Sequence, residues 1–103
     1  MRMRYWLTYD LGLRGEYQEL YGWLDDNDAK ECGDGVATLV SSKSWKTIQT
    51  ELKKILDDKA RVYLVYKKKD GSFTGTFILG KRKRAPWSGY GAKAVGVDSE
   101  DEG

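Results

Sequence analysis

The sequence has no histidine and only one cysteine, Cys32. Without an imidazole base, serine-histidine and cysteine-histidine nucleophilic catalysis are both excluded. A single cysteine also excludes an intrachain disulfide and a cysteine-based zinc cluster. We expect Cys32 to be buried, because a free thiol usually packs as a small hydrophobic group.

Long hydrophobic runs are also lacking. No apolar segment approaches the roughly 18 residues that a membrane-spanning helix needs. The basic N-terminus lacks the apolar stretch and cleavage site of a secretory signal, so we expect a cytoplasmic protein with no membrane contact. The 103 residues, 40% hydrophobic and 33% charged, are typical of one globular domain. We expect that domain at residues 1–92 and a disordered acidic tail at 93–103.

Charge is unevenly distributed, although the net charge is only +2. Residues 1–66 carry ten Lys or Arg against eleven Asp or Glu. Residues 67–93 carry eight against one, and residues 94–103 carry none against four. The positive charge is therefore concentrated in one late block, which favours an anionic partner.

Hydrophobic periodicity predicts five strands and two helices. Strands are expected where apolar residues alternate or β-branched residues gather, at residues 4–11, 29–32, 36–42, 60–68 and 72–79. Helices are expected where apolar residues recur every three or four positions, at residues 16–26 and 44–58. The first helix would bury a stripe made of Tyr17, Leu20, Tyr21 and Leu24.

The order of these elements predicts an α+β fold of the ferredoxin-like type. A βαββαβ unit would place both helices on one face of an antiparallel sheet, with an additional C-terminal strand completing a hairpin. Asp70 and Gly71 tolerate the positive φ that a tight hairpin turn demands. Ser42 or Ser44 is expected to cap the second helix.

Asp10 stands where the first strand ends, and the residue pattern leaves two interpretations open. It is either a turn residue whose carboxylate accepts backbone N–H groups, or a working acid. The next acid in the sequence is Glu16, and a solitary carboxylate makes a poor magnesium site. A catalytic Asp10 therefore requires a second copy of the chain.

The succession of motifs resembles a known family. The segments "YWLTYDL", "EYQELYGWLDDNDAKEC" and "TELKKILDDKARVYLV" are similar to the SinR-like proteins, relatives of the CRISPR adaptation protein Cas-two. The resemblance covers about residues 5–66 and implies a ferredoxin-like homodimer that binds nucleic acid. It also implies that Asp10 of each protomer faces its symmetry mate and holds Mg²⁺ for phosphodiester hydrolysis, as in an endoribonuclease or other endonuclease. Arg14 would then clamp a phosphate.

Two basic runs flank the predicted hairpin: Lys67, Lys68 and Lys69 before it, and Lys81, Arg82, Lys83 and Arg84 after it. They approach each other only if the hairpin folds back completely. Clustered cations attract polyphosphates, and Trp87 and Tyr90 would add base stacking. These residues form the predicted nucleic-acid-binding set. The alternative is an edge strand that lysines protect against aggregation, with Pro86 ending the sheet.

The sequence leaves two further functions open. The first is a non-catalytic assembly or scaffold subunit, which would dock a protein or nucleoprotein partner and leave Asp10 dispensable. The second is a toxin-like ribonuclease that resembles the virulence-associated VapD proteins. The sequence does not distinguish RNA from DNA as the partner.

Overall fold

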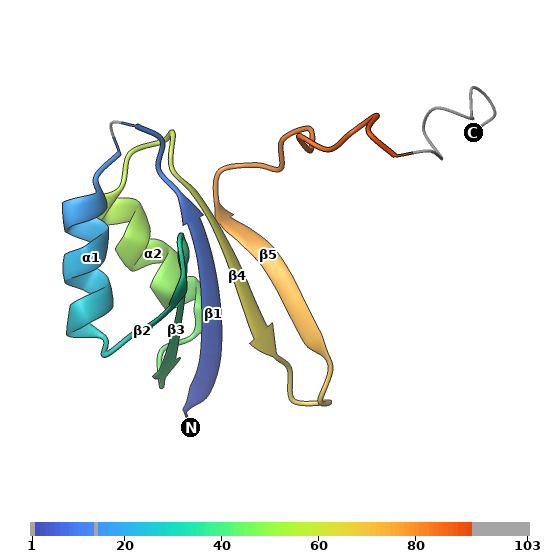
Figure 1. Ribbon diagram of the computed structural model, residues 1–103. Helices are drawn as coiled ribbons and strands as arrows, with labels where there is room; N and C mark the ends of the chain where they lie inside the picture. Colours follow the sequence, from blue (N-terminus) through green and yellow to red (C-terminus); the bar gives the residue numbers. More distant parts are fainter. Residues whose placement is uncertain (1, 14, 92–103) are drawn as a thin grey trace.

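The computed structural model describes residues 2–13 and 15–91 (Figure 1). Arg14 and the predicted acidic tail at 93–103 lie outside the described residues. Seven elements follow one another: β1 (Met3–Asp10), α1 (Tyr17–Asp26), β2 (Lys30–Gly33), β3 (Val36–Ser41), α2 (Trp45–Ile55), β4 (Arg61–Lys67) and β5 (Phe73–Leu79). No helix within the described ranges is long and apolar enough to cross a membrane.

The strands form one five-stranded sheet in the order β2-β3-β1-β4-β5, and all four pairings are antiparallel. Both helices lie on the same face of this sheet (Figure 1). The predicted α+β class, with two helices over an antiparallel sheet, is confirmed. The arrangement is compatible with a ferredoxin-like fold.

The core lies between the helices and the sheet. Alternate residues of β1 point into it, so Tyr5 and Leu7 are fully buried, as the period of a strand requires. The other buried apolar side chains come from all layers of the fold: Leu11, Leu20, Leu24, Ala37, Leu39, Ile48, Leu52, Leu56, Ala60, Val62, Leu64, Ile78 and Leu79. The residues between them in β1 and β4 point to the opposite, helix-free face.

Two burial predictions were wrong. Tyr21 is 54% exposed, because it lines an open hollow between α1 and the β2–β3 turn rather than the core. Cys32 is exposed because it lies in β2, a short edge strand that leaves most of its side chains in solvent. Helical and strand periodicity therefore identified the elements, but not which side chains at the edge of the core are exposed.

The second helix begins as expected. The Ser44 side chain accepts a hydrogen bond from the backbone N–H of Thr47 at 3.2 Å, so Ser44, and not Ser42, is the N-cap. Glu51 joins the two helices, since its Oε1 accepts from Lys43 Nζ at 2.8 Å and from Trp23 Nε1 at 2.9 Å. The hydrogen bond from Lys43, followed by that from Trp23, lowers the pKa of Glu51 against the opposing effect of burial.

A tight turn joins β4 and β5 at the predicted Asp70-Gly71 pair. Gly71 has a φ of 91°, and Asp70 Oδ1 accepts from the backbone N–H of Ser72 at 2.9 Å and from its hydroxyl at 2.6 Å. These two bonds lower the pKa of the Asp70 carboxyl. The backbone N–H of Lys68 donates to the carbonyl oxygen of Ser72 at 2.7 Å. This bond holds the basic residues before the turn in place.

Candidate nucleic-acid interface

The face of the sheet opposite the helices carries a row of aromatic side chains. Trp6, Tyr63, Phe73 and Phe77 come from β1, β4 and β5. The rings of Trp6 and Phe73 meet at a centroid distance of 5.9 Å, and those of Tyr63 and Phe77 meet edge to face at 4.9 Å. No helix of the described residues covers this face (Figure 1). The side chains are thus half-buried or exposed rather than part of the core.

Basic side chains surround the lower end of this aromatic row. We call this surface the basic hollow, a depression of about 550 Å³ lined by Arg2, Met3, Arg4, Trp6, Tyr66, Lys67, Lys68, Lys69 and Phe73. Five of the lining residues are cationic and none is acidic. Arg2 and Arg4 lie just before and at the beginning of β1, and the three lysines lie at the end of β4 and in the turn that follows. The antiparallel register brings these two segments together, with Tyr5 opposite Tyr66.

The two arginines of the basic hollow are anchored on β3. Arg2 Nη2 donates to the carbonyl oxygen of Val40 at 2.9 Å, and Arg4 Nη1 donates to the Thr38 hydroxyl at 2.9 Å. Each guanidinium keeps further N–H groups for an anion, because it has five donors. Sequence reasoning missed both arginines, although they stand within the predicted first strand and its approach.

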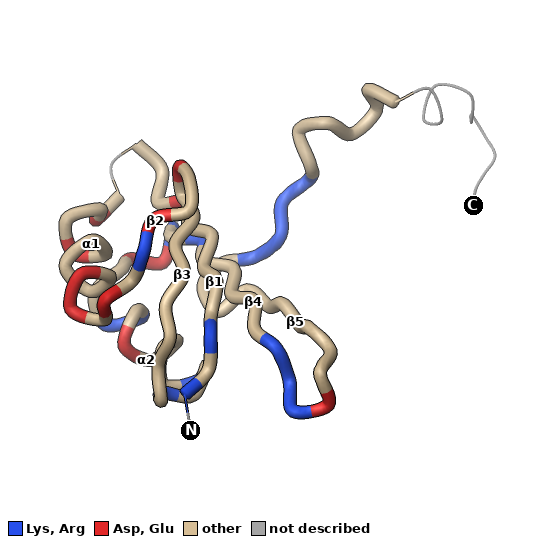
Figure 2. Tube along the Cα trace, turned by 60° about the horizontal axis from the view of Figure 1, so that its bottom comes forward, with Lys and Arg blue, Asp and Glu red and all other residues tan. Residues whose placement is uncertain are grey.

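The structure separates the two predicted basic runs. Lys67, Lys68 and Lys69 lie at the β4–β5 turn, whereas Lys81, Arg82, Lys83 and Arg84 follow the far end of β5 (Figure 2). The hairpin does fold back, with Lys67 opposite Phe73. The seven residues of β5 nevertheless keep the runs about 20 Å apart, at roughly 3.3 Å per residue.

The second basic run covers the other aromatic pair. The Arg82 guanidinium lies 5.3 Å from the Phe77 ring centroid and 5.8 Å from that of Tyr63, within the range of cation–π attraction. Gly75 lets the Tyr63 ring lie against β5, because a Cβ at this position would be 2.7 Å from carbons of that ring. The Arg61 side chain also lies over Phe77, at 5.5 Å.

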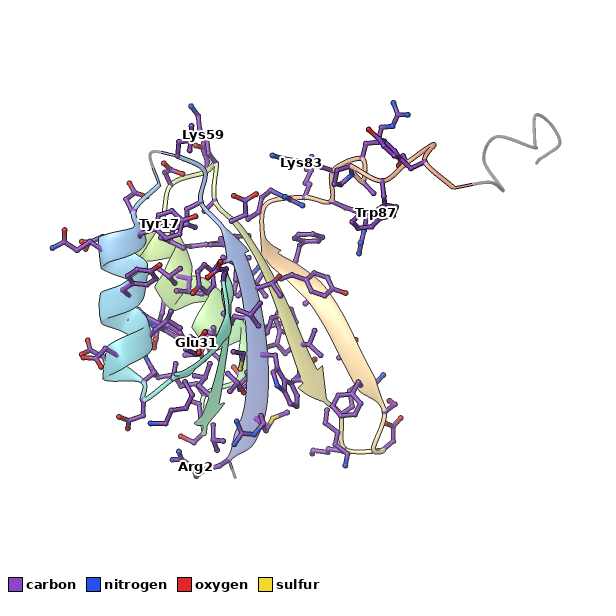
Figure 3. The ribbon with its side chains drawn as sticks, viewed as in Figure 1. Arg2, Tyr17, Glu31, Lys59, Lys83 and Trp87 are labelled. Atoms are coloured by element: carbon purple, nitrogen blue, oxygen red, sulfur yellow. The ribbon has the colours of Figure 1, made fainter. Side chains whose placement is uncertain are left out.

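Trp87 and Tyr90 are 74% and 86% exposed. They belong to a segment that projects from the end of β5, and Figure 3 places Trp87 and Lys83 at the opposite end of the sheet from Arg2. The structure therefore groups Trp87 and Tyr90 with the second basic run, away from the basic hollow.

Asp10 lies at the end of β1 with its side chain 59% exposed. Its Oδ1 accepts from the backbone N–H of Gly12 at 3.1 Å, and its Oδ2 lies 3.5 Å from Arg61 Nη1. The first contact is the bond that a turn residue makes. The predicted phosphate clamp, Arg14, lies outside the described residues.

A second carboxylate approaches this end of the sheet within the same chain. Asp34 and Asp10 line one hollow of about 490 Å³, together with Arg61 and Arg82. Across residues 2–13 and 15–91, no three Cys, Asp or Glu side chains gather closely enough to hold a metal ion. Magnesium bound to Asp10 therefore needs ligands from elsewhere, and its binding stays a prediction.

Acidic and aromatic residues occupy the other side of the molecule. A hollow of about 580 Å³ between α1 and the β2–β3 turn is lined by Tyr9, Tyr17, Tyr21, Asp25, Glu31 and Asp34, among others. Burial, followed by the neighbouring tyrosines and the acids Glu31 and Asp34, raises the pKa of Tyr9. Figure 2 shows acidic residues gathered around α1 and β2, while basic residues mark the β4–β5 turn and the segment after β5. A polyanion is therefore attracted to the basic residues at the β4–β5 turn and repelled from the acidic residues around α1 and β2.

Comparisons with known proteins do not extend the assignment. No family model matches the chain, and no curated protein or solved structure matches it. The resemblance to the SinR-like and Cas-two proteins stays a prediction, and the interface described above rests on its own geometry.

Proposed function

We propose that the protein binds nucleic acid and that the five cations of the basic hollow contact its phosphates. The observation that carries this proposal is the composition of the hollow: Arg2, Arg4, Lys67, Lys68 and Lys69 line it without a carboxylate among the lining residues. Ordinary protein surfaces mix charges of both signs. Cations on two neighbouring strand ends suit the regularly spaced charges of a polyphosphate.

The second basic run extends the attraction along the helix-free face. Arg82 and Arg61 lie at the far end of that face, over the Tyr63 and Phe77 rings. At that end the two arginines share a hollow with Asp10 and Asp34, so the cations without acidic neighbours are those of the basic hollow. Further acidic side chains gather around α1 and β2 (Figure 2). This distribution orients a nucleic acid toward the basic hollow and away from α1 and β2.

The fold proposal is ferredoxin-like, with β5 as an added strand beside β4. It is supported by the central position of β1 between β3 and β4 and by the outer position of β2. We extend the proposal to a cytoplasmic homodimer of the SinR-like and Cas-two type. Its support is the edge of β5, which pairs with β4 on one side only within the described residues, because an unpaired edge accepts a further strand.

Phosphodiester hydrolysis is a second candidate, favoured by the exposed Asp10 and by Asp34 in the same hollow. Arg61 and Arg82 would bind the phosphate there. Asp10 of each protomer would hold magnesium, which when bound activates water as a Lewis acid. The scaffold alternative keeps the basic surfaces for a nucleoprotein partner and leaves Asp10 as a turn residue.

A salt-titrated binding assay with single-stranded RNA, single-stranded DNA and duplex DNA tests the proposal. If all five cations contact phosphates, log K should fall against log salt with a slope of about −3.5, since each contact contributes roughly −0.7 on a single strand. No binding to any of the three at low salt would contradict the proposal.

The same assay with magnesium separates the two candidates. Cleavage that depends on magnesium and disappears in Asp10→Ala would support hydrolysis. Binding without cleavage, unchanged in Asp10→Ala, would favour a binding or scaffold protein and remove Asp10 from the working residues.

A further inference from the structure

Resting on the proposed function, we infer that the basic hollow is specific for single strands, because Trp6 and Phe73 provide a stacking site for one unpaired base. The five cations alone would bind any polyphosphate. The two rings add a surface that only an accessible base face can use.

Phe73 is the first observation that supports a stacking site. It is 61% exposed, although a phenylalanine gains stability chiefly from burial. It begins β5 directly after the turn and lies opposite Lys67. Its ring meets Trp6 at a centroid distance of 5.9 Å and an interplanar angle of 60°. The two tilted rings thus contact each other and both line the hollow.

The second observation is that cations flank these rings on both sides. Lys67, Lys68 and Lys69 lie at the β4–β5 turn, on the side of Phe73, while Arg2 and Arg4 lie before and at the start of β1, the strand of Trp6, and all seven residues line the hollow. A base inserted between the two groups would keep its neighbouring phosphates within reach of the side chains. Stacking on aromatic rings is tolerant of base identity, because every base has a π-face.

The other aromatic pair does not offer an equivalent site. The Arg82 guanidinium covers Tyr63 and Phe77, and Arg61 also lies over Phe77. A base would have to displace these planar cations before stacking. Tyr63 and Phe77 also line a hollow, of about 490 Å³, but Asp10 and Asp34 line it too and would repel a phosphate. The hollow lined by Trp6 and Phe73, of about 550 Å³, has no acidic lining residue and lies within the size range of small-ligand pockets.

A duplex gains less from this arrangement. Its bases are stacked and paired internally, so it presents phosphates to the cations but no free base face to Phe73. Extruding a base from a duplex costs a few kcal/mol. The hollow should therefore favour single strands by the free energy of one stacked base.

The test compares three probes of equal length: oligothymidylate, the same backbone with abasic residues, and oligothymidylate paired with oligoadenylate. Wild-type protein should bind oligothymidylate about ten- to a hundredfold more tightly than the abasic strand, the usual range for one stacked base. Phe73→Ala should remove this preference, and Phe73→Trp should restore it. Tyr21→Ala is the matched control, since Tyr21 is an exposed aromatic residue on α1. The preference of this variant for oligothymidylate over the abasic strand should equal that of the wild-type protein.

Equal affinity of the wild-type protein for the normal and abasic strands would overturn the inference while leaving the proposed function intact. A Phe73→Ala variant that weakens both strands alike would overturn it as well, because Phe73 would then support the hollow rather than a base. Binding to none of the three probes at low salt would overturn both proposals and assign the exposed Phe73 to a protein partner. Circular dichroism of each variant checks that the fold is kept.

Discussion

Replacing Lys67, Lys68 and Lys69 together with glutamate is expected to abolish nucleic-acid binding. The three side chains supply three of the five cations of the basic hollow, and the change reverses their charge at the site where phosphates would lie. Non-specific nucleic-acid binding typically has a Kd of about 10⁻⁴–10⁻⁶ M. We expect the affinity to fall by at least about a hundredfold, because three attractive contacts become repulsive. Fluorescence anisotropy with a labelled single strand measures it.

The matched control reverses three lysines on α2: Lys46, Lys53 and Lys54. All three are exposed and lie on the helix side of the sheet. Because three lysines become glutamates in both variants, the change in net charge is identical. This variant should retain most of the affinity, because the hollow itself is unaltered. An equal loss in both variants would show that net charge, and not the basic hollow, governs binding.

Truncating Leu64 to alanine is expected to lower the free energy of unfolding by about 2–5 kcal/mol. Leu64 is 0% exposed in β4, on the face of the sheet that the helices cover, so its removal leaves a cavity in the core. Urea denaturation measures the change. The large range reflects how far the surrounding side chains relax into the space.

Val65 is the natural control, since it follows Leu64 in the same strand and points to the helix-free face. It is half-buried, and Val65→Ala should cost clearly less than Leu64→Ala. Equal costs for the two substitutions would mean that both faces of the sheet are covered in solution. That outcome would contradict the open aromatic face on which the interface depends.

The elements of this fold could be predicted because their signals are local. Alternation identified β1 and β4, helical spacing identified α2, and the Ser44 cap lies three residues from the N–H it satisfies. Burial was less predictable. Tyr21 fits the helical stripe but lies at its rim, and Cys32 lies on an edge strand; both depend on which elements become neighbours, a property of tertiary structure.

The candidate site shows the same limit. The lysines before the hairpin were predicted from their clustering, whereas Arg2, Arg4 and the Trp6–Phe73 pair were not predicted as part of the interface. They join the lysines only through the pairing of β1 with β4 and of β4 with β5. The two basic runs, conversely, are close in sequence but lie at opposite ends of β5.

Asp10 also depends on a distant partner. Its bond to Gly12 follows from the local turn sequence, but its contact with Arg61 spans 51 positions of the chain. The ion pair is long and largely exposed on the Asp10 side, so it contributes little stability. Its consequence is a cation beside the carboxylate, which favours phosphate binding at this end of the sheet.

The most direct test of nucleic-acid binding at the basic hollow is a titration of the isotope-labelled protein with oligothymidylate, followed by NMR of the backbone amides. We predict that the largest shifts fall on Arg4, Trp6 and residues 67–73, while Tyr17 and Asp25 on α1 stay unchanged. Shifts confined to α1 and β2, with none at the β4–β5 turn, would contradict the assignment of the basic hollow as the nucleic-acid interface.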